Sequence, residues 1–153
     1  MKTGSVNVSP KGMDSLRVLD PKKVVWLNLT GSGNETATHL QESDRMTIMF
    51  CSFGEKPLIL RLYGKAKVFH PRDEEFADHI TRFPNYIGAR QIIEMDVGLV
   101  QTSCGFAVPF MELKGERPML KRWAEKKGQE NIEVYWVEKN TTSLDGFSTN
   151  ILK

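Results

Sequence analysis

Residues 30–34, Thr-Gly-Ser-Gly-Asn, are the stretch whose residue types and spacing could bind a charged ligand. They follow the apolar run 24–29 and supply small residues that tolerate a tight turn. Ser32 and Glu35 are spaced as a capping box, in which the two side chains bond free N–H groups at the start of a helix. The free N–H groups and the positive dipole end of such a helix suit an anion such as phosphate.

This turn lacks the features of the common nucleotide-binding loops. No Gly-Lys-Ser/Thr follows the glycines, so the turn is not a P-loop. Thr36 stands where a dinucleotide fingerprint has its third glycine. An ordinary strand-to-helix connection with a good cap is therefore the alternative interpretation of this stretch.

The elements that would position this turn are mostly strands. Alternating or continuous apolar residues predict strands over residues 5–9, 16–19, 24–29, 45–53, 58–69 and 90–104. The run 45–53 is apolar enough for a strand that is covered on both sides. Gly64 interrupts its strand and predicts a bulge.

Helices are predicted directly after the turn, over residues 73–83 and over residues 118–127. Phe76, Ile80 and Phe83 form the buried stripe of the second helix, and Gly128 is expected to end the third. Residues 129–139 fit a helix or a strand, and we favour the helix, whereas the tail from about residue 140 is expected to be loose. Because strict alternation of strand and helix is absent, the predicted fold class is α+β, mainly antiparallel β, around a small barrel.

Length and composition are those of one globular domain spanning residues 1–153. The chain is 40% hydrophobic and 26% charged, and its net charge of +2 is too small to indicate nucleic acid or an anionic membrane as a partner. No signal peptide and no run of membrane-spanning length is visible, so a cytoplasmic location is expected. Cys51 and Cys104 lack metal-ligand spacing, so no metal site is expected and both are predicted to be buried, reduced thiols.

Four motifs in a fixed order resemble the pyridoxamine 5′-phosphate oxidase-like family of FMN-binding split barrels. They lie at residues 6–12, 29–40, 60–64 and 100–105. The resemblance covers residues 5 to about 128 and is closest to the uncharacterised oxidase-like branch of the family. It implies a split β-barrel with short flanking helices, and a homodimer that holds FMN in the clefts between its subunits.

The resemblance also implies which residues bind the cofactor. Lys11 matches a phosphate-binding lysine and Thr30 a hydroxyl ligand, and the turn and helix that follow Thr30 hold the phosphate. Gln101 and Ser103 match positions that reach the flavin from the second subunit. The implied cofactor-binding residues are Lys11, Thr30, Ser32, Asn34, Thr36, Gln101 and Ser103.

Two departures from the family pattern bear on this site. Where the family has an Arg-Lys pair, this chain has Glu35-Thr36, which places a carboxylate near the implied phosphate. Arg17, Arg45 or Arg61 would then have to compensate for the lost positive charge. Family members usually begin with a helix and a first strand ahead of the segment that matches residues 6–9, and the resemblance implies that this chain lacks both.

A flavin-dependent oxidoreductase acting on an unknown small molecule is the function that the resemblance implies. The substrate-binding C-terminal segment of the vitamin B6 enzyme is missing, since Val137 and Glu138 follow Trp136, so oxidation of pyridoxamine phosphate is not expected. No side chain is singled out as a catalytic acid or base, and Cys104 is either a redox thiol or an ordinary cysteine at a strand end. The alternatives are a non-enzymatic module that stores or carries flavin or another cofactor, and a truncated, inactive homologue.

Overall fold

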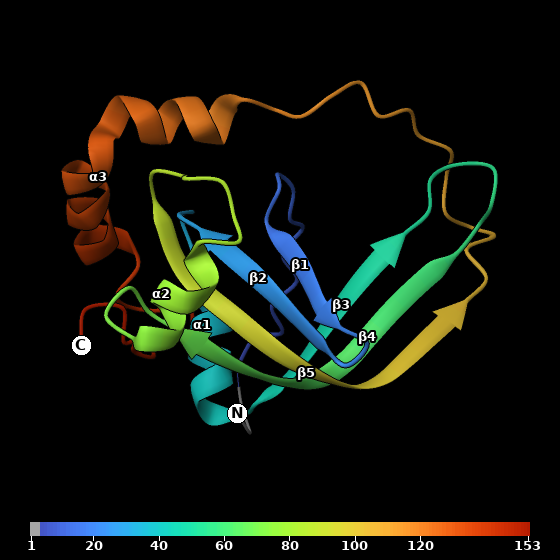
Figure 1. Cartoon of the computed structure of the whole chain (residues 1–153), viewed down its shortest axis with the longest axis horizontal. Helices are drawn as coiled ribbons and strands as arrows, with labels where there is room; N and C mark the ends of the chain where they lie inside the picture. Colours follow the sequence, from blue (N-terminus) through green and yellow to red (C-terminus); the bar gives the residue numbers. More distant parts are fainter. Residues whose placement is uncertain (1–3) are drawn as a thin grey trace.

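The fold is built on a curved antiparallel sheet of five strands (Figure 1). The computed structural model describes residues 4–153. In chain order the elements are β1 (Leu16–Asp20), β2 (Lys23–Leu29), α1 (Glu35–Glu42), β3 (Arg45–Cys51), β4 (Ile59–Phe69), α2 (Glu74–Ile80), β5 (Ala89–Ser103) and α3 (Met119–Lys139). Every strand that the sequence predicts from residue 16 onwards is confirmed, and so are the positions of the helices.

β5 is the central strand of the sheet and the longest, with 15 residues. The strand order is β1-β2-β5-β4-β3, and each pair of neighbours is antiparallel. Residues 89–96 of β5 pair with β2, and residues 92–103 pair with β4. At about 3.4 Å per residue, β5 is roughly 50 Å long, so its two ends lie in distant parts of the molecule.

Gly64 lets β4 and β5 stay paired where their register shifts. The shift falls between Tyr63 and Gly64. A Cβ atom on residue 64 would collide with the backbone carbonyl of Asp96 on the neighbouring strand. The predicted bulge at this glycine is therefore confirmed, and the absence of a side chain is what permits it.

One face of the sheet closes around a core to which all five strands contribute. Its buried members are Val24, Trp26, Ala66, Ile93 and Met95. Leu16 of β1 and Ile48 of β3 pack against this core from the two edge strands, and Leu40 of α1 covers it. Because both edge strands contribute to the same cluster, the sheet curves around it as part of a barrel.

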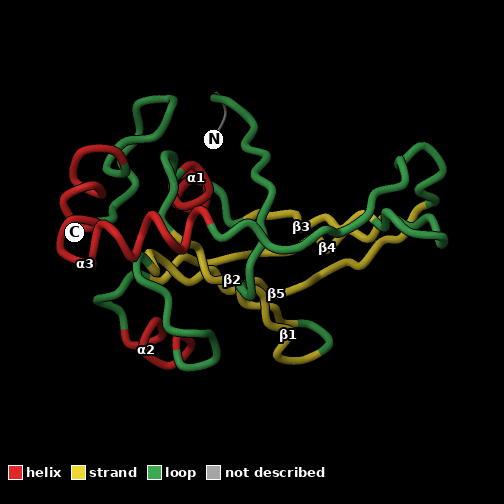
Figure 2. The backbone as a smooth tube through the Cα atoms, turned by 90° about the horizontal axis from the view of Figure 1, so that it is seen from above, coloured by secondary structure: helices red, strands yellow, loops and turns green. Residues whose placement is uncertain are grey.

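The opposite face of the sheet is covered by α2, so that α1 and α2 lie on different sides of the strands (Figure 2). Phe76 and Ile80 pack there against buried side chains of β2 and β5, as predicted. Phe83 packs in the same cluster, but from the turn that follows α2, because the helix ends at Ile80 and is shorter than the predicted 73–83. Burial of these aromatic rings on a two-sided sheet is a large favourable contribution to folding.

α3 consists of two helical halves that meet at a bend. Gly128 has φ 73° inside the span, a backbone conformation that favours glycine. This confirms that the first half ends at Gly128 and that residues 129–139 are helical. Ala124, Ile132 and Trp136 form the buried side of the two halves and pack with Ile151 from the tail.

Two of the predicted strand features are wrong. Residues 5–9 form no strand, and Val6 and Val8 are 91% and 84% exposed. Their alternation is real, but no neighbouring strand edge in residues 4–153 pairs with them. The strand β3 is not covered on both sides either, because it is an edge strand and its Met49 and Phe50 are exposed.

The C-terminal tail is held against the body, contrary to the expected loose tail. Asn140 and Thr149 are fully buried, and the hydroxyl of Thr149 donates to the carbonyl of Asn140. A bridge between Thr142 and Ser148 closes a small loop in between. The predicted class, α+β with a mainly antiparallel, barrel-like sheet and short flanking helices, is confirmed.

Candidate functional site

The turn that follows β2 is anchored by Thr30. The Thr30 N–H and hydroxyl both donate to the carbonyl of Gly88, at 2.9 and 2.8 Å. The indole Nε1 of Trp136 donates to the same hydroxyl at 2.8 Å, although Trp136 lies in α3. The buried Thr30 hydroxyl is thus already bonded on both sides, and it fixes the turn between the end of β2 and α3.

The start of α1 differs from the predicted capping box. The helix begins at Glu35 with Asn34 as its N-cap, and no side chain caps it. The carboxylate of Glu35 instead accepts the Leu144 N–H, at 3.0 and 3.1 Å. The predicted capping box is therefore wrong. The Glu35 carboxylate is bonded to the Leu144 N–H of the tail, a donor that the local sequence around the helix does not reveal.

Arg90 is a buried cation beside this turn. It is 2% exposed, and its Nη1 donates to the Gly33 carbonyl at 3.0 Å and to Asn140 Oδ1 at 2.8 Å. Burial lowers the Arg90 pKa to about 10, so the guanidinium still carries its charge at neutral pH. Within residues 4–153 no ion pair joins Arg90 to a carboxylate, and its Nε has no hydrogen-bond partner. Burying a charge whose only partners are neutral carbonyl oxygens has a high cost in desolvation free energy.

Lys11 adds a second positive charge near Arg90. Its ammonium lies 4.7 Å from the centre of the Trp26 ring and donates to Ser9 Oγ at 2.6 Å. Partial burial lowers the Lys11 pKa, and the positive charge of Arg90 lowers it further. The two cations therefore repel each other, and an anion placed between them would relieve that repulsion.

Buried polar groups without partners lie at the start of α1. Neither amide atom of Asn34 has a hydrogen-bond partner in the described part of the chain, and the same holds for the Thr38 hydroxyl. Asn34 directly follows Gly33, whose carbonyl binds Arg90. Such groups are rare in folded proteins, and the Asn34 amide belongs to the same turn that Arg90 contacts.

The predicted site residues fall into two separate groups. Around the turn, Thr36 accepts a 2.9 Å hydrogen bond from Asn7 that ties residues 4–11 to α1, and Ser32 is exposed. The structure thus brings Lys11, Thr30, Ser32, Asn34 and Thr36 to one end of the sheet.

Gln101 and Ser103 lie at the other end of β5. Gln101 accepts a 3.1 Å hydrogen bond from the Tyr63 hydroxyl, and Ser103 accepts one of 2.9 Å from Arg61. Along the strand, Gln101 is about 35 Å from Arg90. One copy of the chain therefore does not bring the two predicted groups together.

The arginine at the turn is one that the sequence analysis missed. Arg17 pairs with Asp14 and donates to the Arg82 carbonyl, Arg45 donates to Ser43, and Arg61 donates to Ser103. None of these three binds the turn, which Arg90 occupies instead. The sequence does contain one sign of a buried arginine here, because Arg90 is a charged residue at the beginning of the otherwise apolar first half of β5.

The cysteines also differ from the prediction. Both thiols are free, but Cys104 is exposed and Cys51 is only partly buried. The expected burial is therefore wrong for Cys104, because β5 projects beyond the helices at this end. In addition, no helix within residues 4–153 is both long and apolar enough to cross a membrane.

The fold and the site together define an α+β protein with a curved antiparallel sheet and two positively charged side chains, Lys11 and Arg90, at one end of it. No family model matches the chain. Pyridoxamine 5′-phosphate oxidase family protein ustO of Aspergillus flavus is 39% identical over 160 residues, which cover 92% of this chain and 64% of ustO. The chain is thus similar to a protein of the pyridoxamine 5′-phosphate oxidase family, the family that the motifs indicated, and it spans a little under two thirds of this relative's length.

A solved structure also resembles part of the chain. It is a HupZ variant from Group A Streptococcus, with 18% identity and a TM-score of 0.43, and the match covers 58% of this chain and 73% of HupZ. Similarity at this level does not define a shared function.

Proposed function

We propose that this chain binds FMN and holds its phosphate group between Lys11, Arg90 and the turn that follows β2. The observation that carries the proposal is the buried Arg90, which has no carboxylate partner in the described chain and lies near a second cation. Similarity to a protein of the pyridoxamine 5′-phosphate oxidase family supports it.

The chemistry of the site fits a phosphate monoester. A phosphate dianion offers oxygen acceptors to both cations, and the flat guanidinium of Arg90 can donate to it from the groups that its protein partners leave free. The amide of Asn34 can donate as well, and N–H groups at the start of α1 add a favourable dipole. Glu35, the expected source of repulsion, has its carboxylate bonded to the Leu144 N–H.

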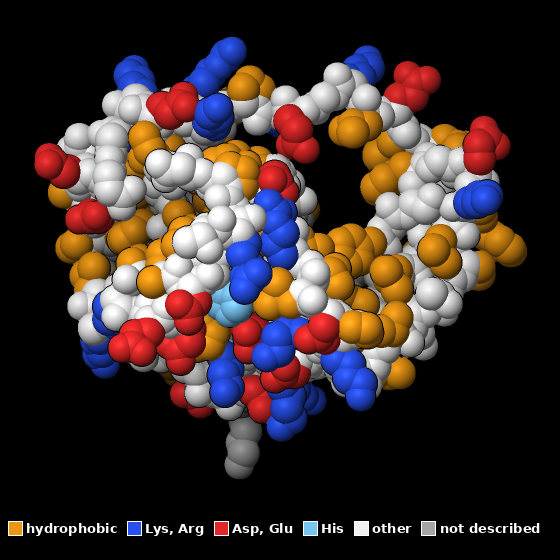
Figure 3. Space-filling view, in the orientation of Figure 1, with side chains coloured by type: hydrophobic (Ala, Val, Ile, Leu, Met, Phe, Trp, Pro, Cys, Tyr) orange, Lys and Arg blue, Asp and Glu red, His pale blue; other side chains and the backbone are white. Residues whose placement is uncertain are grey.

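A homodimer would complete the site, since Gln101 and Ser103 are too far from Arg90 to reach the same flavin. The ends of β3, β4 and β5 and the segments that follow them, residues 49–60 and 99–113, project from the body and are called the arm here. Exposed apolar side chains of the arm are Met49, Phe50, Phe53, Leu58, Leu99, Val100, Phe106, Phe110, Met111 and Leu113. Figure 3 shows hydrophobic side chains around the opening between the arm and the body. Exposed apolar surface of this kind favours association, and a second copy would bring its own arm to the turn.

An oxidoreductase acting on a small molecule is the activity that we infer for the flavin-bound dimer. FMN supplies the redox chemistry when bound. The residues of this chain bind and orient it: Lys11 and Arg90 neutralise the phosphate, Thr30 fixes the turn, and Gln101 and Ser103 offer hydrogen-bonding groups from the partner. The name of the curated relative, a pyridoxamine 5′-phosphate oxidase family protein, supports this inference.

A visible spectrum and a solution mass test this proposal. The purified chain is expected to give flavin absorption after FMN is added and the excess removed, and to have the mass of a dimer. A colourless protein after this treatment would overturn FMN binding. A yellow protein whose flavin is not reduced by any of the nicotinamide donors tested would favour the storage or carrier alternative over the enzyme.

A further inference from the structure

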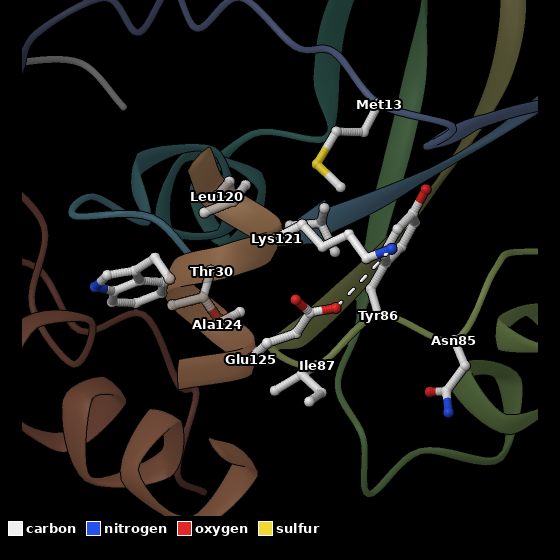
Figure 4. A pocket seen from close by; sticks show the side chains of 11 residues that line it. Met13, Thr30, Asn85, Tyr86, Ile87, Leu120, Lys121, Ala124 and Glu125 are labelled. Carbon is white, nitrogen blue, oxygen red and sulfur yellow. Dashed lines mark ion pairs between the residues drawn. The ribbon is translucent and has the colours of Figure 1, made fainter. Parts of the chain in front are cut away.

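A cavity of about 190 Å³ has Thr30, the first residue of the turn that follows β2, in its wall (Figure 4). Its walls come from three parts of the chain: the end of β2, the loop 85–87 before β5, and the first half of α3. Met13 closes it from the turn that follows Lys11. Apolar side chains dominate the lining, namely Met13, Leu29, Ile87, Leu120, Trp123 and Ala124.

The charged groups of the cavity are paired with each other, and its buried hydroxyl is bonded. Lys121 and Glu125 form an ion pair of 3.9 Å, and both side chains are largely exposed at the rim. The Thr30 hydroxyl in the wall is held by Gly88 and Trp136. No unbalanced charge therefore faces the cavity, and a charged occupant would have to break the ion pair to find a partner.

The cavity is held open by the geometry of its walls. The Trp136 hydrogen bond to Thr30 fixes α3 against the end of β2, and Ala124 is the buried α3 residue that faces the space. Met13 has φ 62°, a strained conformation for a side chain of this size, which such residues adopt where the surrounding structure imposes it. Its flexible thioether can adapt to an occupant.

We propose that this cavity binds a neutral molecule about the size of one aromatic ring, with at most one polar substituent. A dry apolar cavity of about 150 Å³ can hold a benzene molecule, so the volume here suffices for one ring. Trp123 and Tyr86 offer aromatic contacts, and Lys121 and Glu125 at the rim can bond a hydroxyl group. This cavity shares Thr30 with the turn of the proposed FMN site, but its occupant needs neither Lys11 nor Arg90, so the proposal does not depend on FMN binding.

Binding of p-cresol, one ring with one hydroxyl, tests the proposal on the full chain with and without FMN. Nuclear Overhauser effects are expected from the p-cresol ring to the methyl groups of Leu120 and Ile87. Glucose, a polar molecule of similar size, is expected to give none. No contact between p-cresol and these methyl groups at saturation would overturn the proposal.

Filling the cavity provides the matched variant. Ala124→Phe is expected to weaken p-cresol binding at least tenfold, whereas Ala77→Phe, the same change on an exposed position of α2, is expected to leave it unchanged. If Ala124→Phe fails to fold, Ala124→Leu takes its place with the same expected direction. If a folded Ala124 variant binds p-cresol as tightly as the wild type, p-cresol binds at another place, and the assignment of its site to this cavity is contradicted.

Discussion

Asn140 joins the buried cation of the site to the turn that follows β2. Its Oδ1 accepts a 2.8 Å hydrogen bond from Arg90, and its Nδ2 donates to the Gly31 carbonyl at 3.0 Å. The residue that ends α3 therefore sets the position of a guanidinium 50 residues earlier in the chain. This explains how a buried arginine without a carboxylate partner is kept in place.

Asn140→Ala is expected to destabilise the chain by about 2 kcal/mol, because it leaves the Arg90 donor and the turn carbonyls without partners in a buried place. Urea unfolding followed by circular dichroism measures the change. Asn131→Ala is the control, since the Asn131 amide is exposed and bonds only to the Lys127 carbonyl four residues earlier, across the bend of α3. Equal losses of stability in the two variants would contradict the role given to Asn140.

Lys11→Ala is expected to weaken FMN binding by about 1.5–3 kcal/mol, as for the loss of a hydrogen bond between charged groups. Riboflavin, which lacks the phosphate, should bind the variant and the wild type equally. Quenching of flavin fluorescence measures both affinities. Lys126→Ala, which removes an exposed lysine of α3, is the control, and an unchanged FMN affinity in Lys11→Ala would remove Lys11 from the site.

His70 is expected to make stability depend on pH. Burial, followed by the charge of Arg72, lowers its pKa to about 4, from about 6.5 in the unfolded chain. Between these values the unfolded chain binds more protons, so the stability that neutral His70 provides is present above pH 6.5 and is lost as the pH falls towards 4. The loss should reach up to about 3 kcal/mol.

Unfolding experiments between pH 7 and pH 4 measure this effect. His70→Gln removes the titrating group, so its stability should change less over this range than that of the wild type. Parallel curves for the two proteins would show that His70 does not contribute to the pH dependence.

Gly64→Ala is expected to cost about 3 kcal/mol or more, because the new methyl group would collide with the Asp96 carbonyl in the centre of the sheet. The midpoint of thermal unfolding measures the loss. Gly54→Ala is the matched control, since nothing lies within 4 Å of a Cβ at that position. A Gly64→Ala variant as stable as Gly54→Ala would mean that β4 and β5 do not approach each other as described.

Local sequence patterns were sufficient to predict most of the elements. Phe76 and Ile80 were placed on one helical face and pack in one cluster in the structure, because spacing along the chain decides which side chains share a face. Gly64 and Gly128 were also predicted correctly, since a bulge and a bend require local backbone conformations that glycine supplies.

The site was predicted less well, because its contacts join distant parts of the chain. The capping box failed when Leu144, 109 residues away, supplied the partner for Glu35. Arg90 was missed for a similar reason, since Asn140 and the turn at Gly33 hold it from other elements. Val6 and Val8 show the converse case, in which a strand pattern is present and no neighbouring strand pairs with it.

Paired titrations of FMN and riboflavin against the wild type and Arg90→Met test the proposed phosphate site most directly. The wild type is expected to bind FMN at least tenfold more tightly than riboflavin, because only FMN carries the group that neutralises Arg90 and Lys11. In Arg90→Met this preference should largely disappear while riboflavin binding is retained. Equal affinity of the wild type for the two flavins would contradict the assignment of the cationic site to the FMN phosphate.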